Sequence, residues 1–247
     1  QFMQALGEHA RAEGLKLAPR CGYAVAWLKR HARHLVFADF VPEDDELDSV
    51  SSDLVSATRK LLSALRARGY QRIGFVGWME EGDGQPYAEI RCRTYVEWMN
   101  KHGGFQPELC VTARPVERNT EQIGYELTRQ LLSGGAQPDA IITCNDNIAV
   151  GAYRAIHEQG LAIPGDVAVA SFNDISVAQF LNPPLTTIRL PSEEIGETAV
   201  ELLLERAAGR ELSKRISLAS QVIWRTSTRE PVAGAVPNPA PSAVESR

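Results

Sequence analysis

Two short apolar runs separated by an amphipathic segment limit the folds open to this chain more than any other feature. The first run, 138–144, is followed by an Asn-Asp pair that begins at Asn145. The second run, 166–172, is followed by another Asn-Asp pair that begins at Asn173, and the intervening segment 148–161 has the period of a helix. Together they predict a βαβ unit with parallel strands. Ligands of open parallel sheets bind beyond the carboxyl ends of the strands, so we expect Asn145 and Asn173 to lie where a small polar molecule binds.

The rest of the chain predicts further elements of an α/β protein. Strands are expected at 35–40, from Val50, at 72–77, near 105–111 and at 218–226. Helices are expected at 2–14, 23–33, 54–69, 87–102, 120–132 and 195–208. The last residues, 230–247, are rich in Pro, Ala and Ser and predict a disordered tail, because such a composition cannot bury enough apolar surface to fold.

The composition is that of an ordinary globular protein, with 44% hydrophobic and 23% charged residues among 247. This length allows one large or two small domains. A net charge of −5 argues against nucleic-acid binding through general electrostatics. No apolar run approaches the ~18 residues of a membrane span, and the first residues lack the pattern of a signal peptide. We therefore expect a cytoplasmic protein that does not enter a membrane.

The four cysteines, Cys21, Cys92, Cys110 and Cys144, are too widely spaced for a metal-binding knuckle. Most are flanked by apolar residues, which is typical of reduced core thiols in a cytoplasmic protein. Disulfide pairing is the alternative that the spacing leaves open.

Four segments, 145–151, 163–167, 171–174 and 183–188, carry a resemblance to a known family. They read Asn-Asp-Asn-Ile-Ala-Val-Gly, Ile-Pro-Gly-Asp-Val, Ser-Phe-Asn-Asp and Pro-Pro-Leu-Thr-Thr-Ile. Each segment alone is a weak signal, but all four occur in order within about fifty residues. Together they resemble the core domain of the LacI/GalR family of sugar-responsive transcription regulators.

This resemblance implies an α/β architecture with two Rossmann-like subdomains in tandem, like a type I periplasmic binding protein, and a ligand held in the cleft. The first subdomain is expected to comprise residues 1–52 and 192–219. The second is expected to comprise residues 53–191 and 220–229. The chain would then cross between the subdomains three times, and the crossings would act as a hinge.

The amino-terminal part departs from the family pattern. Relatives carry a strand before the first helix, and then two more strands and a helix before the segment that starts here at Tyr23. Either this region is reduced or part of the first subdomain is missing from the sequence, and we favour the second because the remaining sheet would be exposed. The resemblance also implies a helix-turn-helix headpiece before Gln1, so operator DNA binding is expected of the parent protein only.

Three ligand-binding residues of the second subdomain follow from the resemblance. Arg91 matches an arginine that binds sugar hydroxyls, although a surface ion pair is the ordinary alternative for such a residue. Asn145 suits a hydroxyl-rich ligand, and its alternative role is a helix cap, for which Asp146 is the better candidate. Asn173 stands where relatives often carry Asp, so the preference for an effector is open at this position.

Three further candidates are less securely matched. Asp39 and Ser52 correspond to positions of the first subdomain that face the cleft. Tyr87, one helical turn before Arg91, can stack on a sugar ring or form a hydrogen bond with it. Trp78, expected in a polar loop, can do the same or can be a core residue.

The effector is predicted to be a neutral sugar. The run 48–53 resembles the branch of the family that contains the evolved β-galactosidase repressor, so galactosides are the first expectation. Helix 195–208 has apolar residues around more than half of its circumference, which predicts a homodimer surface.

Other functions are weighed against this interpretation. No Gly-x-Ser-x-Gly elbow occurs, the five histidines have no metal-ligand spacing, and no pair of carboxylates can be nominated for glycoside hydrolysis. We therefore predict no catalytic residue, no metal and no cofactor. A periplasmic sugar-binding protein of a transport system shares the fold and is the alternative. The run 183–191 resembles the third crossing of the repressors more closely, and free cysteines fit the cytoplasm.

Overall fold

The computed structural model describes residues 35–39, 41–42, 45–78, 89–114, 120–135 and 137–231. The helices expected at 2–14 and 23–33 and most of the expected tail lie outside these residues. The chain divides into two compact units. Unit 1 comprises Gln1–Asp53 and Pro191–Ser220, and unit 2 comprises Leu54–Leu190 and Gln221–Arg247. The chain therefore passes from one unit to the other after Asp53, after Leu190 and after Ser220.

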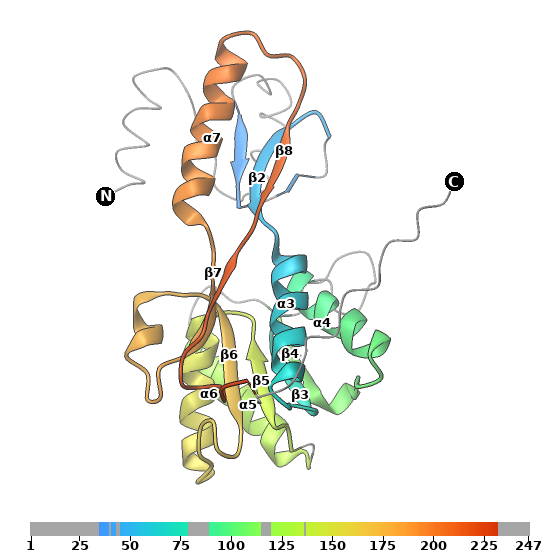
Figure 1. The fold of residues 1–247 in the computed structure, drawn as a ribbon, viewed down its shortest axis with the longest axis vertical. Coiled ribbons are helices and arrows are strands. Elements are labelled where there is room, and N and C mark those ends of the chain that lie inside the picture. Colours follow the sequence, from blue (N-terminus) through green and yellow to red (C-terminus); the bar gives the residue numbers. More distant parts are fainter. Residues whose placement is uncertain are drawn as a thin grey trace. The chain divides into compact units, whose positions relative to one another are not determined.

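Unit 2 is built on a six-stranded sheet with the order β4-β3-β5-β6-β7-β9 (Figure 1). The strands are β3 (Ile73–Trp78), β4 (Cys110–Ala113), β5 (Ala140–Thr143), β6 (Ala168–Asn173), β7 (Thr186–Arg189) and β9 (Gln221–Ile223). All neighbours are parallel except β7 and β9, which pair antiparallel with Arg189 opposite Gln221. The carboxyl ends of β3 to β7 therefore share one edge of the sheet.

Helices cover both faces of this sheet. They are α3 (Leu54–Ala67), α4 (Ile90–Lys101), α5 (Thr120–Ser133) and α6 (Asp146–Glu158), with short 3₁₀ turns at Pro107–Leu109 and Ser176–Gln179. Helices α3 and α4 pack together, as do α5 and α6. The crossover through α4 runs across the sheet in the opposite direction to those through α5 and α6, so the right-handed rule places the two pairs on opposite faces. Every residue of β3 and β5 is consequently buried.

Two glycines bring α5 and α6 into backbone contact. A Cβ atom on Gly124 would overlap the carbonyl of Ile148, and a Cβ atom on Gly151 would overlap the carbonyl of Glu121. The helices pack this closely because both positions lack a side chain.

Unit 1 contains a three-stranded parallel sheet in the described residues, with the order β1-β2-β8. Its strands are β1 (Val36–Ala38), β2 (Asp48–Ser52) and β8 (Arg215–Leu218), and α7 (Ser192–Ala207) packs on β1 and β2 (Figure 1). The core of this unit comprises Val36, Val50, Ile195, Ala199, Leu202 and Leu203.

A buried carboxylate in unit 1 connects the start of β2 with the end of α7 and with the residue before β8. Asp48 is fully buried at the start of β2 and accepts hydrogen bonds from both Arg206 and Arg210 and from the backbone N–H of Lys214. Burial alone would raise the pKa of Asp48, but these hydrogen bonds outweigh it and hold the pKa below its ordinary value. The side chain of Arg206 is itself only 5% exposed.

The architecture confirms the expected α/β class, and three local predictions are wrong. The strand expected near 105–111 lies at Cys110–Ala113, because Pro107–Leu109 form a 3₁₀ turn before it. Residues 218–226 do not form one strand: β8 ends at Leu218 in one sheet and β9 starts at Gln221 in the other, because the chain changes unit between them. Trp78 is not in a polar loop but is the last residue of β3, with only 9% of its surface exposed.

Cys92, Cys110 and Cys144 are free thiols, and Cys21 lies outside the described residues. Burial raises the pKa of Cys144 to about 12. Within the described part of the chain, no group of His, Cys, Asp or Glu is arranged to hold a metal ion. No helix found there is long and apolar enough to span a bilayer.

Candidate functional site

Asn145 is the N-cap of α6. Its backbone is extended, with φ −158° and ψ 166°, and its Oδ1 accepts a hydrogen bond of 2.9 Å from the N–H of Ile148. The expectation that Asp146 would be the cap is wrong, because Asp146 is already the first helical residue and its side chain turns into the protein. Since Oδ1 caps the helix, the amide nitrogen is the group of Asn145 suited to donate to a ligand.

Arg91 lies in the first turn of α4 and reaches toward the ends of two strands. Its Nη1 donates a 2.6 Å hydrogen bond to the carbonyl oxygen of Cys144, the residue before Asn145. Its guanidinium carbon lies 5.6 Å from the ring centre of Phe172, the residue before Asn173. The structure thus brings Arg91 next to the residues that precede both candidate asparagines.

An ion pair holds the Arg91 side chain in this position. Glu89 caps α4 by accepting from the backbone N–H groups of Arg91 and Cys92, and it also accepts a 2.6 Å hydrogen bond from Arg91 Nε. The side chains of Arg91 and Glu89 are only 17% and 6% exposed. Arg91 therefore does form an ion pair, but the pair is largely buried and is not the surface ion pair considered as the alternative to ligand binding.

Asn173 ends β6 and begins a turn with unusual backbone angles. Its φ is 108° and that of Asp174 is 53°, a region that residues other than glycine rarely occupy. Arg225 and Arg189 donate hydrogen bonds to the carboxylate of Asp174 at 2.7 and 2.8 Å. Burial by itself would raise the pKa of Asp174, but the two arginines outweigh it and lower the pKa. Such strained turns persist only where the surroundings hold them, and they cluster at functional sites.

The candidates of unit 1 also lie at carboxyl ends of strands. Asp39 follows β1 with a positive φ of 58°, and the hydroxyl of Ser52, at the end of β2, lies 3.5 Å from Asp39 Oδ1 in a long hydrogen bond. These two side chains are therefore neighbours. Tyr87 lies outside the described residues, and Trp78 is a core residue.

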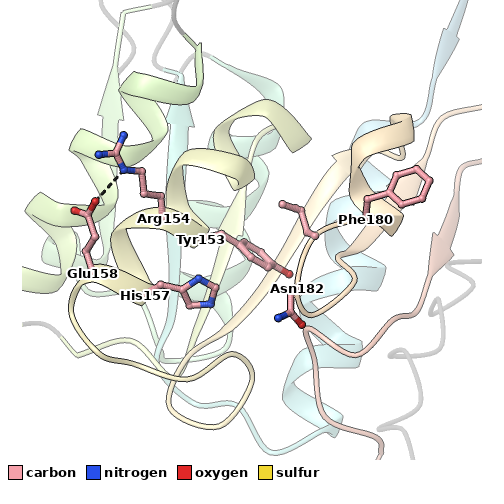
Figure 2. A pocket seen from close by; sticks show the side chains of 7 residues that line it. Tyr153, Arg154, His157, Glu158, Phe180 and Asn182 are labelled. Atoms are coloured by element: carbon pink, nitrogen blue, oxygen red, sulfur yellow. Dashed lines mark hydrogen bonds and ion pairs between the residues drawn. The ribbon is translucent and has the colours of Figure 1, made fainter.

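A hollow of about 560 Å³ lies elsewhere on unit 2 (Figure 2). It is lined by Tyr153, Arg154, His157, Glu158, Phe180, Leu181 and Asn182. Figure 2 shows the ring of Phe180 pointing away from α6, and this side chain is 78% exposed. None of the sequence-predicted ligand residues lines the hollow, so it is separate from the candidate site of unit 2, which is formed by Arg91, Asn145 and Asn173.

The fold, together with polar side chains at the carboxyl ends of parallel strands, defines a periplasmic-binding-protein-like domain. The profile of the periplasmic binding protein-like domain matches residues 62–228. The lactose operon repressor of Rhizobium radiobacter is 55% identical over 112 residues, which cover 45% of this chain and 99% of that protein. The HTH-type transcriptional repressor MelR of Bacillus subtilis (strain 168) is 33% identical over 208 residues, which cover 83% of this chain and 59% of MelR.

A solved structure agrees with these relatives. The crystal structure of a regulatory protein of the LacI family from Chloroflexus aggregans matches with a TM-score of 0.71 and 31% identity, covering 83% of this chain and 72% of that one. This chain belongs to the LacI/GalR family of transcription regulators. It spans about three fifths of the length of MelR.

Proposed function

We propose that this chain is the effector-binding core of a transcription regulator and that its effector is a neutral sugar. The observation that carries the proposal is the position of Arg91, whose guanidinium contacts the residues before Asn145 and Asn173. Arginine and asparagine side chains together supply several fixed donors and an acceptor, which suits the adjacent hydroxyls of a sugar.

A galactoside is the first candidate for this sugar. The relative with 55% identity is named a lactose operon repressor, which supports the galactoside expected from the run 48–53. We propose that Asp39 and Ser52 also bind hydroxyls of the effector, and that Tyr87 contacts its ring. The Asp39–Ser52 pair supports this, because the carboxylate and the hydroxyl oxygen lie side by side and are both acceptors for hydroxyl groups.

Calorimetry against a panel of ligands tests the proposal. Lactose, galactose, ribose and glucose form the sugar arm, while nucleobases and amino acids form the comparison arm. We expect heat of binding and a raised melting temperature with at least one sugar, since a ligand that binds only the folded state stabilises it by mass action. Binding of a nucleobase or an amino acid with no response to any sugar would refute the assignment.

The parent protein is proposed to bind operator DNA through a headpiece and to act in the cytoplasm as a homodimer. Regulators among the relatives support a binding function rather than an enzymatic one, and they favour regulation over periplasmic transport. Leu204 on α7 is 50% exposed although its neighbours Leu202 and Leu203 are buried, which supports a partner surface on this helix. Domains 1–52 with 192–219 and 53–191 with 220–229 are proposed as the two effector-binding subdomains.

A further inference from the structure

Asp146 connects three parts of unit 2 beneath the candidate site. It is the first residue of α6, and its side chain is fully buried. Its Oδ1 accepts a 2.7 Å hydrogen bond from the hydroxyl of Thr187 in β7. Its Oδ2 accepts a 2.9 Å hydrogen bond from the backbone N–H of Ile175, just after the Asn173–Asp174 turn. One carboxylate therefore joins the start of α6, the strand β7 and the turn that follows β6.

The turn needs such support because two successive residues, Asn173 and Asp174, have positive φ. The N–H of Asp174 makes only a long contact of 3.4 Å with the hydroxyl of Thr187. The N–H of Ile175 is the next backbone donor, and Asp146 is its acceptor. Thr187 contacts both Asp146 and the turn, so the carboxylate fixes the turn directly and through this hydroxyl.

We propose that Asp146 is the positioning residue of the effector site: its ionised carboxylate holds the turn at 173–175 so that Asn173 faces the ligand together with Asn145 and Arg91. The proposal rests on the proposed sugar-binding function and deepens it. Asp146 acts through Asn173 and through its chain neighbour Asn145, and it does not itself contact the effector. An ionised carboxylate suits this role because both of its oxygens accept, and Thr187 and Ile175 both donate to it.

The amide of Asn cannot replace the carboxylate fully. In Asp146→Asn, one oxygen becomes an NH₂ group that faces either the N–H of Ile175 or the hydroxyl of Thr187. The hydroxyl can rotate and accept, but the backbone N–H cannot. With the NH₂ group toward Thr187, the amide oxygen still accepts from Ile175, but it is no longer charged. The variant therefore keeps the shape of the side chain and weakens its hold on the turn.

Asp139, on the other side of β5 from Asp146, provides a matched control. It lies just before β5, at the opposite edge of the sheet, and its carboxylate accepts from the N–H groups of Gln71 and Arg72 at 2.7 and 3.0 Å. Asp139→Asn thus removes the same kind of acceptor from backbone donors without touching the turn. Lactose is the probe, and calorimetry measures its affinity for the native chain and both variants.

We expect Asp146→Asn to weaken lactose binding by about tenfold, because hydrogen bonds to a charged carboxylate become hydrogen bonds to a neutral amide. Asp139→Asn should leave the affinity unchanged. Hydrogen exchange gives a second readout that needs no ligand: the amides of 173–178 should exchange faster in Asp146→Asn and not in Asp139→Asn. If Asp146→Asn does not fold, Thr187→Val removes the hydroxyl donor on β7 and should give a smaller change in the same direction.

The pH dependence of lactose affinity gives a third readout. Burial raises the pKa of Asp146, although hydrogen bonds from Thr187, Ile175 and Ser171 oppose it. The titratable groups that face Asp146 are Asp174, whose pKa is lowered, and Tyr153, whose pKa burial raises. As the pH falls, Asp146 therefore takes up a proton before Asp174 does, and lactose affinity of the native chain should fall through that range. Asp146→Asn should show no such fall.

The outcomes separate this proposal from the proposed function. If the native chain binds no sugar, the proposed function fails, and exchange at 173–178 alone decides whether Asp146 holds the turn. Unchanged exchange in Asp146→Asn overturns the positioning role, whether or not sugar binds. Equal loss of affinity in Asp139→Asn, or the same pH profile in Asp146→Asn as in the native chain, overturns it as well.

Discussion

Replacing Asp48 by alanine should destabilise unit 1 strongly. The carboxylate is fully buried and accepts five hydrogen bonds, four from the guanidinium groups of Arg206 and Arg210 and one from the N–H of Lys214. Without it, the buried guanidinium of Arg206 loses its counter-charge. Removing one partner of a buried ion pair costs about 3–5 kcal/mol, a large part of the ~5–15 kcal/mol that stabilises a typical domain.

Hydrogen exchange of α7 and β2 measures this loss for unit 1 alone, because the two units need not unfold together. Asp45→Ala is the control: its carboxylate also pairs with an arginine, Arg215, but is 91% exposed, so water already screens the pair. We expect a large rise in exchange for Asp48→Ala and little change for Asp45→Ala. Equal effects of the two substitutions would show that burial of the pair is not what stabilises this unit.

The same carboxylate sets a pH dependence for unit 1. The pKa of Asp48 is lowered in the folded state from an ordinary value of 3.8. The unfolded chain therefore binds a proton before the folded chain does, and the stabilisation is fully present above pH 3.8. It should disappear as the pH falls through the lower folded pKa. Asp48→Asn should lack this dependence, and an identical acid transition in both proteins would contradict the assignment.

Three further predictions concern the site, the core and the assembly. Arg91→Ala should fold and lose roughly 2 kcal/mol of sugar binding in calorimetry, whereas Arg93→Ala, an exposed residue of the same helix, should bind normally. Gly151→Ala should lower stability in urea by about 1–3 kcal/mol because its Cβ would overlap a backbone carbonyl of α5; unchanged stability would show that the helices separate freely. Light scattering should give about twice the chain mass of 27.1 kDa, and Leu204→Glu should give the single mass; a native chain at the single mass would refute the dimer.

Much of unit 2 could be predicted because its signals are local. Apolar runs and helical periods placed α3 and β3 within two residues of where they lie, at Leu54–Ala67 and Ile73–Trp78. The prediction of one strand at 218–226 was wrong because only the tertiary structure shows that the chain changes sheet at 219–220. Trp78 was misplaced because Gly77, the residue before it, indicates a turn in the sequence. In the structure Gly77 lies within β3 and packs beside Cys144.

The residues of the candidate site could be predicted from the sequence, but the contacts that hold them in place could not. The strand ends at Asn145 and Asn173 follow from the alternation of apolar runs and Asx pairs, while their ligand-binding roles stay predictions. Positive φ at Asn173 has no local sequence signal beyond the tolerance of Asn for that region. The role of Asp146 depends on Thr187, 41 residues away, so a helix-cap rule could only misassign it.

The antiparallel pairing of β7 with β9 offers a way to produce unit 2 without unit 1. Leu190 is the last residue of unit 2 before the chain leaves it, and Gln221 is the first after the chain returns. Arg189 and Gln221 are directly opposite each other in the sheet. A two-residue Asn-Gly turn spans such a pair in ordinary β-hairpins. In a chain that starts at Leu54, residues 190–220 can therefore be replaced by this turn, which leaves unit 2 as one continuous chain that carries Arg91, Asn145 and Asn173.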